Sequence, residues 1–480
     1  MTTSRFSPGT AVAPDAFDRR IPVNYEADLV VIGAGPAGFG AALQAARMGA
    51  RTIVVEKYDM PGGVHTSGLQ GHAAPGVGGI HSELMRRFDA EGCVYTATEE
   101  THPGWAGNPL SHYERNIEPG TPFKRMSFNP DGAGNIMMAM LEEAGVQTLY
   151  GCTFVDVVIC KNAGKDSSIS MIVVKGQEGL FAIRGKIFVE GSGTGEVAAK
   201  AGVACRRGGG GQPEGADWDG VERPVPGGLL WMISGVDYPA LRRYQTQTGD
   251  IKLEKLIAKA KAAGDLPDMV YRPRMGGTEV YGEYYIGHPT VDMSPMLSDD
   301  SFLLWQNVPY EWALHMDDST EDNTRAIREL RGFIHAEAAF LNKYVPGFEN
   351  SFIVHVGRQL GIRDGRHPEG EYCFTLDDVL ANRTFPDAVT PPLTRTFTWN
   401  GRRQHTFEVP YRSFLPKGID NLLLTGASMS FSYETIFMAM RNFTWCTQTG
   451  EIAGFAAALA LEKNDTPKTL EWKQPYRFSD

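Results

Sequence analysis

The chain has 480 residues, of which 42% are hydrophobic and 21% charged. This length exceeds one ordinary hydrophobic core and favours two or three packed domains, and the composition excludes disorder, collagen or a coiled coil as a description of the whole chain. The formal net charge of -11, without any basic block, disfavours nucleic acid as a partner. The 55 glycines follow no collagen period, so we expect them in tight turns and at close backbone approaches to a ligand.

The N-terminal segment and the cysteines bear on the compartment. Residues 1–24 are rich in Pro, Ser and Thr and contain no apolar core of signal-peptide length, so we expect an irregular leader. Nowhere do about 18 apolar residues run unbroken, so no membrane span is expected. The six cysteines lie far apart without a C-x-x-C pair, which argues against a zinc site, a redox-active dithiol and a disulfide framework. The sequence therefore predicts a cytoplasmic protein with free thiols and no metal site, and leaves a homo-oligomer open.

Two regions of alternating elements enclose a segment of different character. An apolar run at 29–32, a glycine cluster, a helical stretch of small residues at 37–48 and a second apolar run at 52–55 predict a β-α-β unit. A helix followed by several strands is expected between 135 and 190. Near the end of the chain, a strand at 421–426 leads into a long helix of small residues. The segment between these regions is rich in Gly and Pro at first and then contains charged helices, which indicates an inserted domain.

We therefore expect an α/β fold in three parts. These are an irregular leader at 1–24, a discontinuous nucleotide-binding domain at 25–205 and 345–470, and an inserted substrate or cap domain at 206–344. The active site is expected where the last two domains meet, because ligands of such folds bind at the carboxyl ends of the parallel strands.

The strongest motif lies in the first β-α-β unit. Gly33, Gly35 and Gly38 fill the three positions of G-x-G-x-x-G between a strand and a helix. The first glycine permits the tight turn, the second leaves room for a pyrophosphate, and the third lets helix and strand pack closely, with the phosphate at the helix N-terminus. Glu56, about 20 residues on, is placed to bind a ribose hydroxyl and disfavours a 2'-phosphate. The spacing alone does not separate FAD from NAD.

Four further segments carry a resemblance to a known family, and this resemblance distinguishes FAD from NAD. EKYDMPGGVHTSGL, KIFVEGSGTGEVAAKAG, LGIRDGRHPEGEY and VPYRSFLPKGIDNLLLTGAS occur in this order, before a closing helix of small residues. Together they resemble the FAD-dependent oxidoreductase family with a glutathione-reductase-like fold, and distantly the fumarate reductase and succinate dehydrogenase flavoproteins. The resemblance implies an α/β glutathione-reductase-like FAD-binding Rossmann domain with an inserted substrate or cap domain, and FAD as the cofactor. It covers roughly residues 25–200 and 345–460.

The resemblance also implies which residues lie against FAD. They come from the glycine turn, the end of the second strand, the Gly62-Gly63 loop, the loop at 191–195 and the turn after 421–425. The cofactor-binding residues expected are Gly33, Gly35, Pro36, Ala37, Gly38, Glu56, Lys57, Gly62, Gly63, His65, Thr66, Ser192, Gly193, Gly426 and Ala427. His65 resembles the histidine that is covalently attached to the flavin in the fumarate reductase relatives, so both a covalent link and a polar loop residue stay open.

Three residues are candidates for catalysis. Tyr433 stands where the family usually has a histidine and is the best single acid or base, with a packing role as the alternative. Arg441 matches a family arginine that can clamp a carboxylate or a flavin oxygen, or cap an acidic neighbour. His72 can face the substrate side or hydrogen-bond loop backbone. The family's Ala-Thr-Gly-Asp loop is Gly191-Ser192-Gly193-Thr194 here, so roles are not simply copied.

Other clusters have a structural interpretation. Arg363, Asp364 and Arg366 are expected to form an arginine and acid network, and the acidic run at 317–322 a solvated helix start. Tyr281, Tyr284, Tyr285 and His288 read either as a strand with alternating tyrosines or as a platform for ring compounds and sugars.

The function expected is that of a dehydrogenase or oxidase. It would take a hydride from a small polar substrate such as an alcohol, a sugar or an amine, and return electrons to oxygen or an external acceptor. No second G-x-G-x-x-G follows a later strand, which disfavours an internal NAD(P)H domain, and the lack of C-x-x-C disfavours disulfide reduction. Two alternatives stay open: reduction of an activated C=C bond, and a flavin-binding protein without catalysis.

Overall fold

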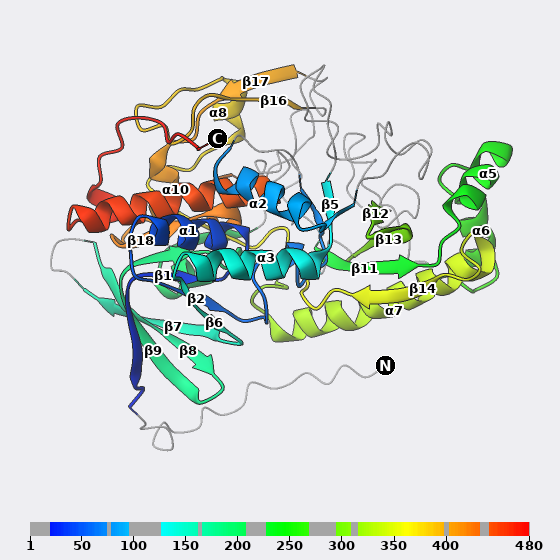
Figure 1. Cartoon of the computed structure of the whole chain (residues 1–480), viewed down its shortest axis with the longest axis horizontal. Coiled ribbons are helices and arrows are strands. Elements are labelled where there is room, and N and C mark those ends of the chain that lie inside the picture. Colours follow the sequence, from blue (N-terminus) through cyan, green and yellow to red (C-terminus); the bar gives the residue numbers. More distant parts are fainter. Residues whose placement is uncertain are drawn as a thin grey trace.

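A computed structural model describes most of the chain (Figure 1). The described residues are 20–73, 78–95, 126–161, 166–207, 227–267, 294–308, 315–397, 403–432 and 441–479. Tyr433, the cluster at 281–288 and nearly all of the predicted leader lie outside them.

A parallel sheet forms the centre of the nucleotide-binding half. Its strands are β1 (Val23–Ile32), β2 (Thr52–Glu56), β6 (Gln147–Tyr150), β9 (Gly179–Glu190) and β18 (Leu422–Leu424), in the order β6-β2-β1-β9 with β18 also pairing with β9. Every residue of β2 is buried, as expected for a strand covered on both faces. The helix α1 (Pro36–Arg47) connects β1 to β2 and completes the predicted β-α-β unit.

Each face of this sheet is covered by a different layer (Figure 1). One face packs against α1, α2 (Gly79–Ala90), α3 (Pro130–Glu143) and α10 (Phe443–Glu462) around one hydrophobic core. The other face packs against an antiparallel meander of β7 (Thr153–Cys160), β8 (Ser168–Gly176) and the first half of β9, with α4 (Glu196–Lys200) beside it. The predicted Rossmann-type α/β fold is confirmed.

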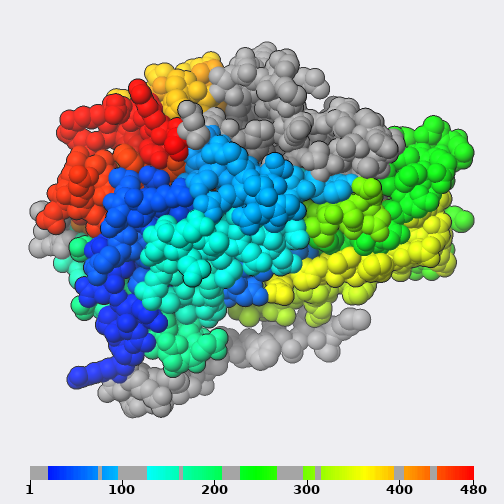
Figure 2. All heavy atoms as spheres, in the orientation of Figure 1, coloured from blue at the N-terminus to red at the C-terminus, as the bar shows by residue number. Residues whose placement is uncertain are grey.

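The insert builds a second, antiparallel sheet. Its order is β12 (Ser294–Met296), β13 (Ser298–Asn307), β11 (Gly228–Ser234) and β14 (Phe352–Val356). The long helix α7 (Thr320–Tyr344) packs on one face with α5 (Tyr238–Thr248) and α6 (Glu254–Ala262), around a core of its own. The strand β14 lies beyond the predicted boundary at 344, and the domain limits themselves stay a prediction. In Figure 2 the insert, in green and yellow, extends from the body of the molecule.

The other elements are short. They are η2 (Gly63–His65), β3 (His72–Ala73), β4 (Val94–Tyr95), β5 (Met126–Phe128), β10 (Cys205–Arg207), β15 (Arg366–Pro368), α8 (Leu376–Leu380), β16 (Leu393–Phe397), β17 (Arg403–Phe407), η5 (Tyr411–Phe414), η6 (Gly426–Ser428) and η7 (Pro467–Thr469). Among the described residues, no helix has the length and apolar character needed to cross a bilayer.

Candidate flavin and substrate site

One cavity joins the two sheets. It has a volume of about 320 Å³ and begins at the carboxyl ends of β1 and β2, where ligands of doubly wound folds bind. Residues of the insert sheet and of the segment 358–363 after β14 line its other side. The cavity therefore lies between the nucleotide-binding half and the insert.

The glycine turn shapes the first part of the cavity. Gly33 has a φ of +91°, and a Cβ there would lie 2.6 Å from the Gly191 carbonyl oxygen. A Cβ on Gly38 would overlap the Gly33 carbonyl oxygen, so this glycine lets helix and strand touch. The helix α1 begins after Gly35 without a side-chain cap or an acidic residue in its first turn. Within the described part of the chain, neither a capping side chain nor an acidic residue of the first turn occupies its first N–H groups, so they fit a phosphate.

Glu56 is fixed beside this turn by backbone hydrogen bonds. Its carboxylate accepts from the Ala34 N–H at 2.7 Å and from the Tyr58 N–H at 2.9 Å. Burial raises the pKa of Glu56. The side chain lines the cavity at the end of β2, the position expected for a ribose partner.

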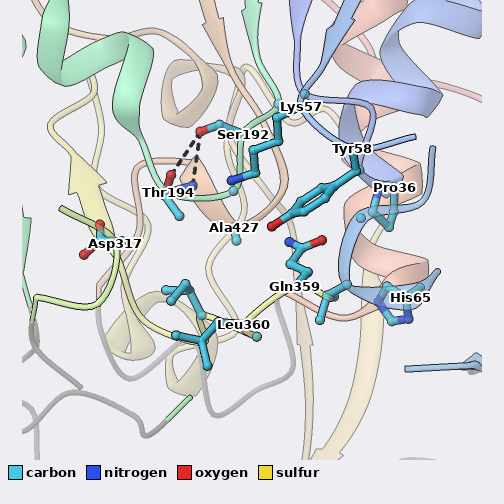
Figure 3. A pocket seen from close by; sticks show the side chains of 18 of the residues that line it. Pro36, Lys57, Tyr58, His65, Ser192, Thr194, Asp317, Gln359, Leu360 and Ala427 are labelled. Carbon is cyan, nitrogen blue, oxygen red and sulfur yellow. Dashed lines mark hydrogen bonds between the residues drawn. The ribbon is translucent and has the colours of Figure 1, made fainter. Parts of the chain in front are cut away.

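A polar wall follows at the end of β9. The buried Glu190 accepts from the Ser192 hydroxyl at 2.5 Å and from the Val197 N–H at 2.7 Å. Burial raises the pKa of Glu190. In Figure 3, Ser192 and Thr194 meet at one side of the cavity through their hydrogen bonds. Glu196 lines the same wall, and burial, followed by the charge of Glu190, raises its pKa to about 7.

Polar side chains without a partner point to a ligand. In Figure 3, Lys57 and Tyr58 extend into the cavity from the end of β2, and Gln359 enters from the segment after β14. The Gln359 Oε1 atom and the Thr425 Oγ1 atom are buried at the cavity wall and have no hydrogen-bond partner among the described residues. Such atoms normally find a partner. Together with the glycine cradle, they fit a dinucleotide such as FAD.

His65 lies at the far edge of the cavity in Figure 3. Its Nδ1 atom is 2.9 Å from the Gln70 carbonyl oxygen, so Nδ1 carries the proton and donates. The ring packs edge-on against Phe443, with centroids 4.6 Å apart. Burial, with a smaller contribution from the charge of Arg441, lowers the pKa of His65 to about 4, although the hydrogen bond to Gln70 opposes this shift. The imidazole is therefore neutral at neutral pH.

Most predicted cofactor residues line the cavity, and a few support it from behind. The lining includes Gly33, Gly35, Pro36, Ala37, Glu56, Lys57, Gly63, His65, Ser192, Gly193 and Ala427. Gly38, Gly62, Thr66 and Gly426 are not in it. A Cβ on Gly62 would overlap Thr66, whose hydroxyl donates to the Pro61 carbonyl oxygen at 2.6 Å. The Gly426 N–H donates to the Thr449 hydroxyl at 3.2 Å. The contact of all fifteen predicted residues with FAD stays a prediction.

The catalytic candidates have different locations. Arg441 lines the cavity, and its charge lowers the pKa of His65 and opposes the burial that raises the pKa of Cys446 to about 12. His72 is buried outside the lining, and its ring lies 5.5 Å from that of Trp305, which does line the cavity. Tyr433 lies outside the described residues. The catalytic roles of all three stay predictions.

Two of the structural expectations have different outcomes. Arg366 does join a network of arginines and acids through its ion pair with Asp317, whereas Asp364 Oδ1 lies 2.7 Å from His367 Nε2 and so contacts a histidine. The expectation of a solvated acidic run is wrong for Asp317, whose side chain has 0% exposure. Arg207 and Arg366 compensate its charge. A run of acidic residues does not indicate that arginines distant in the sequence will pair with it.

The fold and the cavity define a dinucleotide-binding protein of the Rossmann type. The sequence matches the family described as FAD dependent oxidoreductase over residues 28–475, so the chain belongs to this family and is an enzyme that uses FAD.

Individual relatives are more distant. The sarcosine oxidase subunit alpha of Rhizobium meliloti is 37% identical over 106 residues, which cover 21% of this chain and 10% of that one. The chain thus matches about a tenth of that relative's length. Two solved structures are similar over most of the chain. A geranylgeranyl bacteriochlorophyll reductase-like protein from Thermoplasma acidophilum is 13% identical over 92% of this chain and 80% of that one, with a TM-score of 0.43. The p-nitrophenol 4-monooxygenase from Pseudomonas putida is 11% identical over 92% and 82%, with a TM-score of 0.40.

Proposed function

We propose that the protein takes a hydride from a C–H bond of a small polar substrate, such as an alcohol, a sugar or an amine. The electrons then pass to oxygen or to an external acceptor. The observation that carries this proposal is the shared cavity, which both the nucleotide turn at Gly33 and the insert residues Leu230 and Trp305 line. A cavity of this kind lets one half of the protein hold the cofactor while the other orients a substrate.

Two side chains that line the cavity, Arg441 and His65, support hydride transfer. FAD, when bound, supplies a ring that accepts or gives a hydride. Arg441 can hold an anionic or carbonyl group of the substrate through its guanidinium. His65 is neutral because burial lowers its pKa to about 4, so it adds no second positive charge beside Arg441. Tyr433 is the residue proposed to take up the substrate proton.

The sequence and one relative favour oxidation of a substrate over reduction by a nicotinamide. The chain has no second G-x-G-x-x-G that follows a strand. The relative from Rhizobium meliloti is named a sarcosine oxidase subunit, and sarcosine is an amine. An amine is therefore among the first substrates to test.

A second candidate is the reduction of an activated C=C bond. Arg441 favours it, because a guanidinium at the cavity wall can polarise the carbonyl group of an enoate. This reaction would need an external reductant.

The test is anaerobic mixing of the FAD-loaded protein with panels of alcohols, sugars and amines. We expect at least one compound to bleach the visible absorption of the oxidised flavin. Tyr433→Phe should slow the bleaching by about 100-fold or more, whereas Tyr25→Phe, a matched change beside Phe181 outside the cavity lining, should leave it unchanged. Reoxidation of prereduced protein by an enoate, with no bleaching by any of the panels, would overturn the first candidate in favour of the second.

A further inference from the structure

A cluster of four charged side chains joins the insert to the nucleotide-binding half. The Arg207 guanidinium contacts Asp317 at 2.7 Å and Asp318 at 2.6 Å. Arg366 contacts Asp317 at 3.3 Å and Asp318 at 3.9 Å. Two positive and two negative charges therefore balance. Three of its side chains are shielded, because those of Arg207 and Arg366 are only 18% and 16% exposed and that of Asp317 is 0% exposed, whereas that of Asp318 is 31% exposed.

The two signs of charge come from different parts of the fold. Arg207 ends β10 and Arg366 begins β15, and these residues face each other in an antiparallel pair. Asp317 precedes α7, the long helix of the insert, and also lines the cavity. The carboxylates before α7 thus meet two arginines that the pairing of β10 with β15 holds side by side.

Arg366 makes one more contact, and this contact reaches the cofactor wall. Its Nη1 atom donates to the Thr194 carbonyl oxygen at 3.1 Å. Thr194 belongs to the loop at 191–195, in which Ser192, Gly193 and Thr194 all line the cavity. The packing around this contact is tight. A Cβ on Gly365 would lie 3.2 Å from Asp317 Oδ2 and 3.4 Å from Thr194 Cα.

We propose that Asp317 and Arg366 are positioning residues for FAD. Asp317 orients the Arg366 guanidinium, and Arg366 holds the loop at 191–195 in its place at the cavity wall through the Thr194 carbonyl. The affinity for FAD therefore depends on the docked insert, although neither residue belongs to the nucleotide motif. Removal of the Asp317 charge leaves Asp318 as the only one of the two carboxylates beside the two shielded arginines, and the Arg366 guanidinium loses the partner that orients it toward the Thr194 carbonyl.

The test compares FAD binding with stability for Asp317→Asn and for a matched control. Asp378→Asn is the control, because Asp378 has a side chain 2% exposed, pairs with Arg383 at 2.9 Å and does not line the cavity. The dissociation constant of FAD is measured by fluorescence titration of each apoprotein, and Tm is measured on the same samples. We expect Asp317→Asn to weaken FAD binding about tenfold or more, as for a lost hydrogen bond to a charged group. Asp378→Asn should change it less than about twofold.

Arg366→Lys separates positioning from stability, and it decides alone if Asp317→Asn does not fold. A lysine keeps the positive charge but lacks the planar fork that serves a carboxylate and a carbonyl together. We expect a Tm of the apoprotein close to that of the parent, a several-fold weaker FAD complex and a changed visible circular dichroism of the bound flavin. An unchanged dissociation constant for Arg366→Lys overturns the proposal. So does a loss of FAD affinity in Asp317→Asn and Asp378→Asn that follows their loss of Tm equally. Substrate turnover plays no part in these readouts.

Discussion

Burial controls the protonation of the ionisable side chains around the cavity. It lowers the pKa of His65 to about 4 and, with the charge of Glu190, raises that of Glu196 to about 7. At neutral pH the imidazole is neutral and the Glu196 carboxyl is only partly ionised. The net charge of the side chains that line the cavity is therefore set by desolvation as much as by the number of acidic and basic residues.

The raised pKa of Glu196 predicts how stability depends on pH. The folded apoprotein binds the Glu196 proton more tightly than the unfolded chain does. This contribution is present below the usual pKa of 4.5 and is lost as the pH rises through about 7. Glu196→Gln cannot ionise, so we expect the variant to exceed the parent in free energy of unfolding at pH 8 by roughly 1 to 2 kcal/mol.

Urea denaturation of the two apoproteins at pH 4.5 and at pH 8 measures this difference. The exposed Glu142→Gln serves as the control and should show the parent's pH profile. A Glu196→Gln advantage that is equal at both pH values would contradict the assignment.

His65 predicts how FAD is held. Its side chain is nearly inaccessible, its Nδ1–H donates to Gln70, and its ring packs against Phe443. These contacts hold the imidazole in place as part of the wall, so we expect FAD to be bound without a covalent bond. Acid precipitation should leave the yellow colour in the supernatant. A covalent link would be shown if the colour stays in the pellet of the parent protein but appears in the supernatant of the His65→Ala variant.

At the scale of elements, close packing of two helices holds the nucleotide turn. A Cβ on Gly450 would overlap the Ala37 carbonyl oxygen, and one on Gly454 would overlap that of Ala41. In the opposite direction, a Cβ on Gly40 of α1 would overlap the Thr447 carbonyl oxygen of α10. The helices α1 and α10 are therefore in backbone contact, and this contact fixes the end of α1 that faces the cavity.

Gly450→Ala tests this contact. We expect the added methyl group to push α10 from α1, to lower the free energy of unfolding by about 2 kcal/mol or more, and to weaken FAD binding, because Ala37 lines the cavity. Gly332→Ala is the matched control in α7, where the new Cβ would meet nothing within 4 Å. It should stabilise the protein by up to about 1 kcal/mol. Thermal unfolding and FAD titration distinguish the two. A Gly450→Ala variant as stable as Gly332→Ala would rule out the contact.

At the scale of the whole molecule, local patterns predict the first half of the fold well. The helix expected at 37–48 is α1 at Pro36–Arg47, because small residues at helical spacing meet a strand on each side. In the insert, α5 was not predicted, since it is mostly polar and buries only Leu241 and Gln245. The pairing of β14 with β11 was not predicted either. The helices α5, α6 and α7 separate the two strands in the sequence, and the residues of a strand do not indicate which distant strand it pairs with.

The site shows the same division between local and distant information. Gly33 and Glu56 lie in one continuous motif whose spacing alone places them at the cavity. Gln359, Trp305 and Asp317 reach the same cavity from separate segments, and only the tertiary fold brings them there. An unpaired amide oxygen such as that of Gln359 becomes visible only when its surroundings are known.

A crystal structure of the protein with FAD bound is the most direct measurement of where the cofactor lies. We predict electron density for the adenosine end beside Gly33 and Glu56, and for the flavin ring in the same cavity, in contact with Arg441 or Trp305, which also line it. A flavin ring found outside this cavity, or a dinucleotide bound in the opposite direction, would contradict the assignment of the site.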